Sequence, residues 1–354
     1  MGQVKSCVGD ARERGCWSAV LYPKVAPEWY RKLVSGVGSQ DVHVQPAPEG
    51  SLLLLGHISL SVPDLQPTNQ YWIESGVRAG RSCHEVAGQE VRVNLGPSQC
   101  RFPLAQGQPQ KWPGEICIWV EDIRQTTDFF NMLGQTFGTD IVSDVKQAPT
   151  GGEFMLKLRD PFRQFFVYAS ECPRGWAPKL RAIGHDPSTA DAEYPPRTMN
   201  PVALIDATVL ISSRAVMLGV CRFYQHYLMQ PLAPPGPSQY SVQVHFGPGE
   251  GLHQTLTFLQ DPAVPSYSNL GSICIYVKDR GAFIRIYARC KAAGLLKNPQ
   301  LTREDVNRDC EFSLRAIQDP ETKGDIIPLE HVIRHPGHPD CHVSPDPRTS
   351  SKSA

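Results

Sequence analysis

One ten-residue pattern recurs along the chain, and this pattern decides the fold. Its copies are GHISLSVPDL at 56–65, GEICIWVEDI at 114–123 and GSICIYVKDR at 271–280, with the looser IDATVLISSR at 205–214. In each copy, residues alternate as on the two faces of a β-strand, and an Asp or Ser near its end can cap a following helix. An element repeated in this way indicates an architecture assembled from modules.

Each copy opens a module in which a helix candidate and further strands follow. EVRVNLG (90–96) and SQCRFPLA (98–105) are predicted as two strands after the first copy, and residues 280–296 form a clear amphipathic helix pattern after the last. A Pro- and Gly-rich stretch at 173–200 separates the modules two by two. We therefore expect a partly disordered lead-in at 1–50, a first domain at 51–172, this linker, a second domain at 201–335 and a flexible tail at 336–354. Neighbouring modules are expected to pair inside each domain, because a small sheet cannot bury both of its faces alone.

The composition argues against several classes of partner. The formal net charge is +0, so no bulk electrostatic attraction to nucleic acid or to a membrane surface is expected. The 11 cysteines form no CxxC pair, and several lie in apolar runs, which is typical of reduced thiols in a cytoplasmic protein. The opening MGQVKSC matches the N-myristoylation pattern at Gly2, but chance explains so short a match better. Only that lipid would direct the chain to a membrane.

The pattern and its flanking turns resemble the vicinal oxygen chelate (VOC) superfamily, the glyoxalase, bleomycin-resistance and extradiol-dioxygenase group. The resemblance rests on SVPDL, WVEDI and YVKDR, and on the turns RDPFRQ at 159 and QDPETKG at 318. Two further segments, VNLGPSQCRFPLAQGQP and DPETKGDIIPLEH, are similar to a two-domain branch whose members mostly lack an assigned reaction. The resemblance implies an α+β fold of tandem βαβββ modules, paired into two half-barrel domains. It also implies a cup in each domain, with a divalent metal held by residues of the first and last strands.

The second position of the repeated strand supplies the metal-ligand candidates. In the four copies this position holds His57, Glu115, Asp206 and Ser272. Pairing neighbouring modules would direct His57 and Glu115 into one cup. Asp206 and Glu330, from the last predicted strand, would serve the other. Carboxylate and imidazole ligands suit Fe, Mn, Ni or Zn, provided that three or four of them converge.

The closing strand of the first module places Arg101 where a metal ligand is expected. A cation would repel a metal, and in the second module the matching position falls near Val167, which cannot ligate one. Two roles for Arg101 stay open. It can hold an anionic substrate, such as a carboxylate or phosphate, or it can form an internal ion pair with Glu115. The second role would fill a lost metal site with protein charge.

Glu330 and His331 are adjacent on a predicted strand, so at most one of them lines the cup. The following RHPGHPDCH contains several His residues and one Cys, but its Pro content and terminal position favour a surface loop over a metal-binding tract.

Two functions from different classes fit these residues. The first is a divalent-metal-dependent lyase, isomerase or dioxygenase acting on a small oxygenated metabolite, in which Glu330 or Glu115 moves a proton. The second is a catalytically inactive relative that binds a small ligand, or serves as a scaffold, through degenerate metal sites. The sequence names neither the substrate nor the oligomeric state.

Overall fold

The repeated pattern forms the first strand of each module in the computed structural model. The structure describes residues 50–69, 72, 83–123, 142–147, 154–159, 162, 166–172, 201–236, 238–247, 254–264 and 270–341. The predicted lead-in up to residue 49, the linker at 173–200 and the tail from residue 342 lie outside these ranges.

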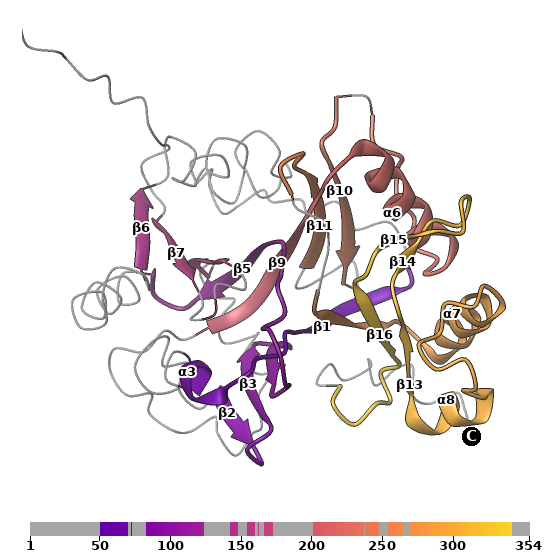
Figure 1. Cartoon of the computed structure of the whole chain (residues 1–354), viewed down its shortest axis with the longest axis horizontal. Coiled ribbons are helices and arrows are strands. Elements are labelled where there is room, and N and C mark those ends of the chain that lie inside the picture. Colours follow the sequence, from indigo (N-terminus) through magenta and orange to yellow (C-terminus); the bar gives the residue numbers. More distant parts are fainter. Residues whose placement is uncertain are drawn as a thin grey trace, which may run out of the picture.

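The elements follow the module order that the sequence predicts (Figure 1). The first module contains β1 (Leu52–Ser59), α3 (Leu65–Asn69), β2 (Cys83–Val86), β3 (Glu90–Leu95) and β4 (Ser98–Pro103). The second contains β5 (Gly114–Val120), β6 (Val142–Gln147), β7 (Phe154–Arg159) and β8 (Phe166–Glu171). The third contains β9 (Pro201–Ile211), α6 (Arg214–His226), β10 (Ser241–Phe246) and β11 (Gln254–Gln260). The fourth contains β12 (Ser272–Val277), α7 (Arg280–Ala292), α8 (Arg303–Asp309), β13 (Glu311–Leu314), β14 (Ile317–Gln318), β15 (Asp325–Ile327) and β16 (Glu330–Arg334).

The residues at the end of the repeated strand cap the next helix, as predicted. The Ser213 side chain accepts a hydrogen bond from the backbone N–H of Val216 at the start of α6. Asp279 accepts one from the backbone N–H of Ala282 at the start of α7. Each cap satisfies one of the free N–H groups of a first helical turn, which is why the strand-to-helix junction recurs with the same residue types.

The strands form two seven-stranded sheets, which we call sheet 1 and sheet 2. Sheet 1 has the order β13-β16-β12-β1-β4-β3-β2, and sheet 2 has the order β10-β11-β9-β5-β8-β7-β6. Sheet 1 therefore combines the first module with the fourth, and sheet 2 combines the second with the third. In Figure 1, indigo β1 lies among orange and yellow elements from the other end of the chain. The expected pairing of neighbouring modules is wrong, although the α+β architecture of paired βαβββ modules is confirmed.

Glycines at the start of the repeated strand permit this pairing. Gly271 immediately precedes β12. A Cβ atom at this position would clash with the carbonyl oxygen of Ser59 at the end of β1. A Cβ on Gly114 of β5 would clash in the same way with the carbonyl oxygen of Thr208 in β9. Both glycines thus allow a close antiparallel approach between first strands of different modules. The alternating pattern by itself does not encode which first strand is the partner, because all four copies share it.

The two sheets share one apolar core on their helix-covered faces. Residues of β1, β3, β4, β9, β11, β12 and β16 join α6 and α7 in a single buried cluster. Buried Gln254 of β11 connects the sheets: its Oε1 accepts from the backbone N–H of Leu55 in β1 (3.0 Å), and its Nε2 donates to Ser98 Oγ (2.7 Å) and to the Leu204 carbonyl (2.9 Å). A buried amide satisfied on both sides ties β1 and β4 of sheet 1 to β9 of sheet 2.

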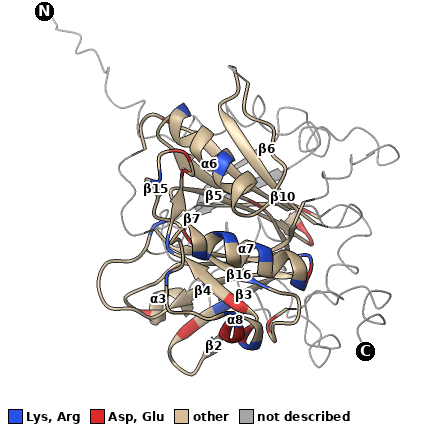
Figure 2. Cartoon of the chain, turned by 90° about the vertical axis from the view of Figure 1, so that its right-hand side faces the viewer, with Lys and Arg blue, Asp and Glu red and all other residues tan. Residues whose placement is uncertain are grey.

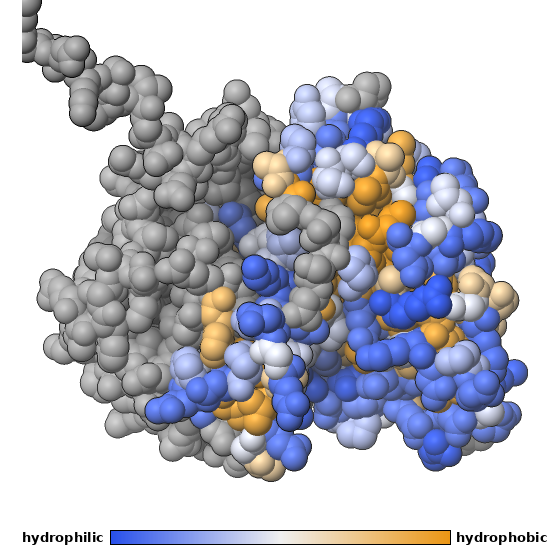
Figure 3. All heavy atoms as spheres, in the orientation of Figure 1, coloured by the Kyte–Doolittle hydropathy of each residue, from blue (hydrophilic) through white to orange (hydrophobic). Residues whose placement is uncertain are grey.

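The outer side of the described helices is polar. Lys and Arg residues lie along α7, and both positively and negatively charged residues lie on α8 (Figure 2). The described surface over these two helices is mostly hydrophilic (Figure 3). No helix in the described ranges is both long and apolar enough to cross a membrane. Eight cysteines of the described residues are free thiols, namely Cys100, Cys117, Cys172, Cys221, Cys274, Cys290, Cys310 and Cys341.

Candidate functional site

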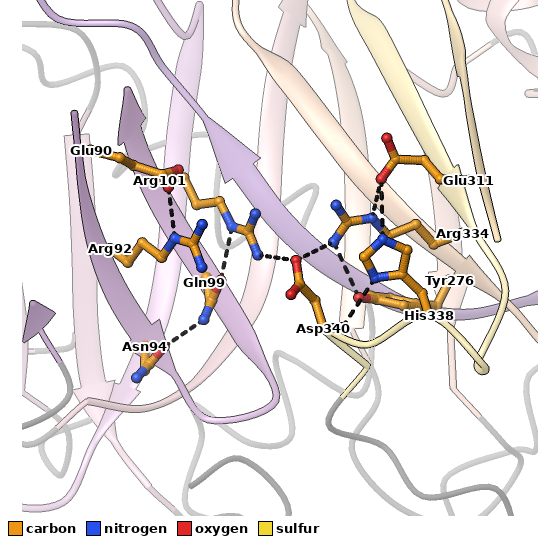
Figure 4. Close-up of polar contacts among 10 residues, drawn as sticks. All are labelled: Glu90, Arg92, Asn94, Gln99, Arg101, Tyr276, Glu311, Arg334, His338 and Asp340. Carbon is orange, nitrogen blue, oxygen red and sulfur yellow. Dashed lines mark hydrogen bonds and ion pairs between the residues drawn. The ribbon is translucent and has the colours of Figure 1, made fainter. Parts of the chain in front are cut away.

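The face of sheet 1 that points away from the apolar core carries a network of polar side chains, in which Arg92 and Glu90 form a pair of their own (Figure 4). Strand register places His57 of β1 beside Cys274 of β12 and beside Gln99 of β4. Because side chains alternate along strands, every second residue of these strands is directed to this face. Figure 4 shows the network, whose members come from β3, β4, β12, β13, β16 and the residues after β16. They are Glu90, Arg92, Asn94, Gln99, Arg101, Tyr276, Glu311, Arg334, His338 and Asp340.

Arg101 is only 9% exposed and reaches across the network to Asp340. Its Nη2 lies 3.2 Å from Asp340 Oδ2, and its Nε donates to Gln99 Oε1 at 2.8 Å. Gln99 Nε2 in turn donates to Asn94 Oδ1 at 2.7 Å, which fixes the orientation of the amide. The alternative of an ion pair between Arg101 and Glu115 is wrong. These two residues lie on different sheets, and Asp340 takes the place expected for Glu115.

Arg334 approaches the same carboxylate from the opposite module. Its Nη1 lies 3.0 Å from Asp340 Oδ2, its Nε donates to Glu311 Oε2 at 2.6 Å, and the guanidinium also contacts the Tyr276 hydroxyl at 3.4 Å. Two guanidinium groups from β4 and β16 therefore converge on one carboxylate oxygen (Figure 4). Burial alone would raise the pKa of Asp340. The hydrogen bond from Arg101 and the positive charges of Arg101 and Arg334 together outweigh burial, so the pKa of Asp340 is lowered.

His57 lies within reach of these charges. Burial, followed by the positive charges of Arg101, Arg334 and Arg92, lowers its pKa well below the ordinary range. The imidazole is therefore neutral at physiological pH, which suits a metal ligand. However, the three arginines Arg92, Arg101 and Arg334 that help to keep His57 neutral would repel a metal ion. The nearby carboxylates Glu90, Glu311 and Asp340 are already paired with these arginines. The residues around His57 do not fit a divalent metal.

Glu330 lies at the other end of β16 from Arg334. It pairs in register with Ser272, and its carboxylate accepts from Lys297 Nζ at 3.0 and 2.8 Å. His331 points to the opposite face, where its Nδ1 contacts the Leu329 carbonyl at 3.0 Å and its Nε2 contacts the Tyr224 hydroxyl at 2.7 Å. Burial lowers the pKa of His331 to about 4. The prediction that at most one of these two residues lines the polar face is confirmed.

The corresponding face of sheet 2 is acidic. Asp206 of β9 is 7% exposed and accepts hydrogen bonds from the hydroxyls of Thr208 (2.7 Å), Thr257 (2.7 Å) and Thr255. Glu115 of the neighbouring β5 accepts from the Tyr168 hydroxyl at 3.1 Å. In β8, Tyr168 is thus the residue on this face, whereas its neighbour Val167 is buried in the apolar core.

The predicted ligand sets are therefore divided differently from the expectation. His57 and Glu330 belong to sheet 1, and Glu115 and Asp206 belong to sheet 2. Among the described residues, no group of three or more His, Cys, Asp or Glu side chains is placed to hold a metal ion. Catalytic roles for Glu330 and Glu115 stay predictions.

Tyr276, Arg334 and Asp340 are among the network members that the sequence analysis did not single out (Figure 4). Tyr276 and Arg334 share a strand face with candidate positions, since they follow Ser272 and Glu330 by four residues. This spacing could have found them. Asp340 lies in the stretch that was expected to be a flexible tail. That expectation does not hold for residues 336–341, which turn back onto the sheet and contact both Arg101 and Arg334.

No family model matches the sequence, and no curated protein matches it. Among solved structures, the chain is similar to glyoxalase I from Zea mays, with 14% identity, a TM-score of 0.46 and coverage of 80% of this chain and 92% of that one. It is also similar to 2,2',3-trihydroxybiphenyl 1,2-dioxygenase from Sphingomonas wittichii strain RW1, with 15% identity, a TM-score of 0.27 and coverage of 84% and 94%. Lactoylglutathione lyase from Agrobacterium tumefaciens matches a third of the chain (33%) over 92% of its own length, at 18% identity and a TM-score of 0.24.

The arrangement of the modules decides the fold. Each sheet joins two modules through their first strands, which run antiparallel, and the last strand of each module lies parallel to its own first strand. This arrangement of paired βαβββ modules is the one that the resemblance to the VOC superfamily implies. On the polar face of sheet 1, three arginines lie among three carboxylates (Figure 4), whereas the described charged side chains on the corresponding face of sheet 2 include the carboxylates Glu115 and Asp206.

Proposed function

We propose that this protein binds a small anionic molecule, a carboxylate or a phosphate, on the polar face of sheet 1. The observation that supports the proposal is the convergence of two buried guanidinium groups, those of Arg101 and Arg334, on one oxygen of Asp340. Burying two cations is unfavourable unless anions compensate for the lost hydration. A site built in this way has the charge and the donors that carboxylate and phosphate groups require.

The donors are held in place by the rest of the network. Gln99 and Asn94 orient Arg101 from one module, while Glu311 and Tyr276 orient Arg334 from the other. An anion bound between them would accept from both guanidinium groups without a large rearrangement of either side chain. Neutral His57 lies beside the same groups and offers one donor and one acceptor to an uncharged part of the ligand.

Among the two functions that the sequence left open, this chemistry favours ligand binding over metal-dependent catalysis for sheet 1. A divalent ion that polarises substrate oxygens would be positioned against three arginines, which is electrostatically unfavourable. The predicted role of Arg101 in holding an anionic substrate is retained in the proposal.

The test is a calorimetric titration of the full chain with inorganic phosphate and, separately, with succinate. We expect at least one of them to bind, and Arg101→Gln to weaken binding about tenfold or more, because one charge-assisted pair is lost. Arg308→Gln, on exposed α8, is the matched control and should bind as the parent does. Equal binding by the Arg101 variant, or binding of neither anion by any variant, would contradict the proposal.

A metal-dependent lyase, isomerase or dioxygenase is the second candidate, and sheet 2 is where an observation favours it. Glu115 and Asp206 are both buried carboxylates on adjacent strands, and a bound cation would offset their mutual repulsion. Elemental analysis for Fe, Mn, Ni and Zn tests this candidate. Stoichiometric metal that is lost in Asp206→Asn but retained in Asp340→Asn would support it, whereas metal retained in both would exclude this site.

A further inference from the structure

The segment that follows β16, residues 335–341, folds back over the polar face of sheet 1. Its backbone forms two successive turns, with the His338 N–H donating to the His335 carbonyl (2.9 Å) and the Cys341 N–H donating to the His338 carbonyl (2.9 Å). The His335 N–H donates to the Cys310 carbonyl at 3.1 Å, which fixes the beginning of the segment. Its end is placed by Cys341, which packs against the small apolar cluster around Cys274 and Tyr276.

We infer that this segment is a built-in competitor: Asp340 occupies the anion site as a tethered carboxylate, and an external anion binds by displacing it. The inference rests on the anion binding proposed above and adds the regulation of that same site. Residues 335–341 are called the tail segment below.

The partners of the two arginines show why the site needs an anion. When Asp340 leaves, Arg334 keeps Glu311 as an ion-pair partner at 2.6 Å. Arg101 has no such second partner among the described residues, since its other contact is the neutral amide oxygen of Gln99. A buried guanidinium without an anion is strongly unfavourable, so the open state must be filled by another anion of similar size and charge.

The contacts of Asp340 are weak enough for exchange. The Asp340 side chain is 34% exposed, and it is joined to the arginines at 3.2 and 3.0 Å through a single oxygen rather than as a bidentate pair. Because the carboxylate is partly exposed, water can hydrate it when it leaves, so an external anion can take its place at the buried guanidinium groups. The turns of the tail segment belong to no strand of either sheet. The tether keeps the carboxylate close, and its effective concentration, not its intrinsic affinity, fills the site.

This competition has a measurable size. A ligand whose binding-competent state is only fractionally populated shows an affinity reduced by that fraction. If the tail segment is closed in roughly nine molecules of ten, removing Asp340 strengthens anion binding about tenfold.

The experiment compares phosphate binding by the full-length parent, Asp340→Ala and Asp340→Asn, measured by calorimetry. Asp309→Ala, a loss of one exposed carboxylate on α8, controls for the change in net charge. We expect both Asp340 variants to bind phosphate about tenfold more tightly than the parent and the Asp309 variant. Introducing Arg101→Gln into Asp340→Ala should remove this gain, because the gained affinity comes from the vacated guanidinium.

The possible outcomes separate this inference from the function on which it rests. Unchanged phosphate affinity in the Asp340 variants, with weaker binding in Arg101→Gln, would overturn the competitor role and leave anion binding intact. Absence of phosphate and succinate binding in every variant would overturn both.

A second measurement does not depend on any substitution. Hydrogen exchange of the backbone amides of His338 and Cys341 should accelerate when phosphate saturates the parent protein, because the tail segment is released. Exchange that is unchanged or slower in the saturated protein would contradict displacement.

Discussion

The polar faces of the two sheets are built from the same module but carry different charged groups. On sheet 1, Arg101 and Arg334 contact the carboxylate of Asp340, which comes from the segment after β16. On sheet 2, Asp206 accepts hydrogen bonds from threonine hydroxyls. The repeated strand defines where a side chain is placed, not what chemistry it supplies. The two pairs of modules therefore place different charged side chains on the same strand framework.

The largest effect is expected from breaking the contact between first strands. Gly271→Val places side-chain atoms against the Ser59 backbone, which cannot move aside, and should lower the free energy of unfolding by about 3 kcal/mol or more. Gly114→Val should act similarly in sheet 2, where Thr208 is the obstacle. Urea unfolding measures both, and Gly236→Ala, whose Cβ would make only ordinary van der Waals contacts with the Gln239 side chain, is the control. Small losses in both valine variants would show that the strands do not pair as described.

Acid is expected to destabilise the protein through a histidine of sheet 1. Burial lowers the pKa of His331 to about 4, below the value of about 6.5 in an unfolded chain. The unfolded state therefore binds more protons between these values. The contribution of neutral His331 is complete above pH 6.5 and is lost as the pH falls toward 4, by about 3 kcal/mol in all.

Urea midpoints from pH 7 to pH 4.5 test this. His331→Gln keeps an acceptor for Tyr224 and should flatten the slope, while His226→Gln, on the surface end of α6, should not. A slope equal to that of the parent in His331→Gln would assign the acid sensitivity to other groups, of which buried His57 is the first to examine.

An intermediate effect should separate structure from function in sheet 2. Asp206→Ala removes the acceptor shared by Thr208, Thr255 and Thr257, so buried hydroxyls lose a partner, and the free energy of unfolding should fall by about 2 kcal/mol. Asp206→Asn retains one oxygen and should lose about half as much. Thermal unfolding gives the comparison. A gain in stability would instead indicate that the carboxylate is kept for binding or catalysis at the expense of the fold.

The smallest effect is expected at Glu330. Its partner Lys297 is largely exposed, so Lys297→Met should change the free energy of unfolding by less than about 1 kcal/mol and should leave phosphate binding unchanged. A large loss of phosphate binding in Lys297→Met would mean that Glu330 belongs to the anion site together with Arg334 at the other end of β16.

The sequence was sufficient to predict local structure, but it was insufficient to predict which strands pair. Ser213 and Asp279 could be predicted as caps because capping depends on a few adjacent residues. The face of His331 followed from strand alternation alone. By contrast, the pairing of β1 with β12 depends on contacts between distant strands with nearly identical patterns, which periodicity cannot distinguish.

The candidate site shows the same limit. Arg101 was found because it breaks the expected ligand pattern. Asp340 was not, because composition alone described its surroundings as a surface loop. Its role depends on two arginines that only the fold brings together.

The pairing of the first and fourth modules has a consequence during synthesis. Sheet 2 can close once the ribosome has produced β11, since all of its strands come from the middle of the chain. Sheet 1 cannot close at that stage, because β1 is synthesised early, whereas its partner β12 and the next strand β16 are synthesised much later. Until then β1 has an open hydrogen-bonding edge, so nascent chains stalled between residues 260 and 277 should be the species that chaperones retain or that aggregate.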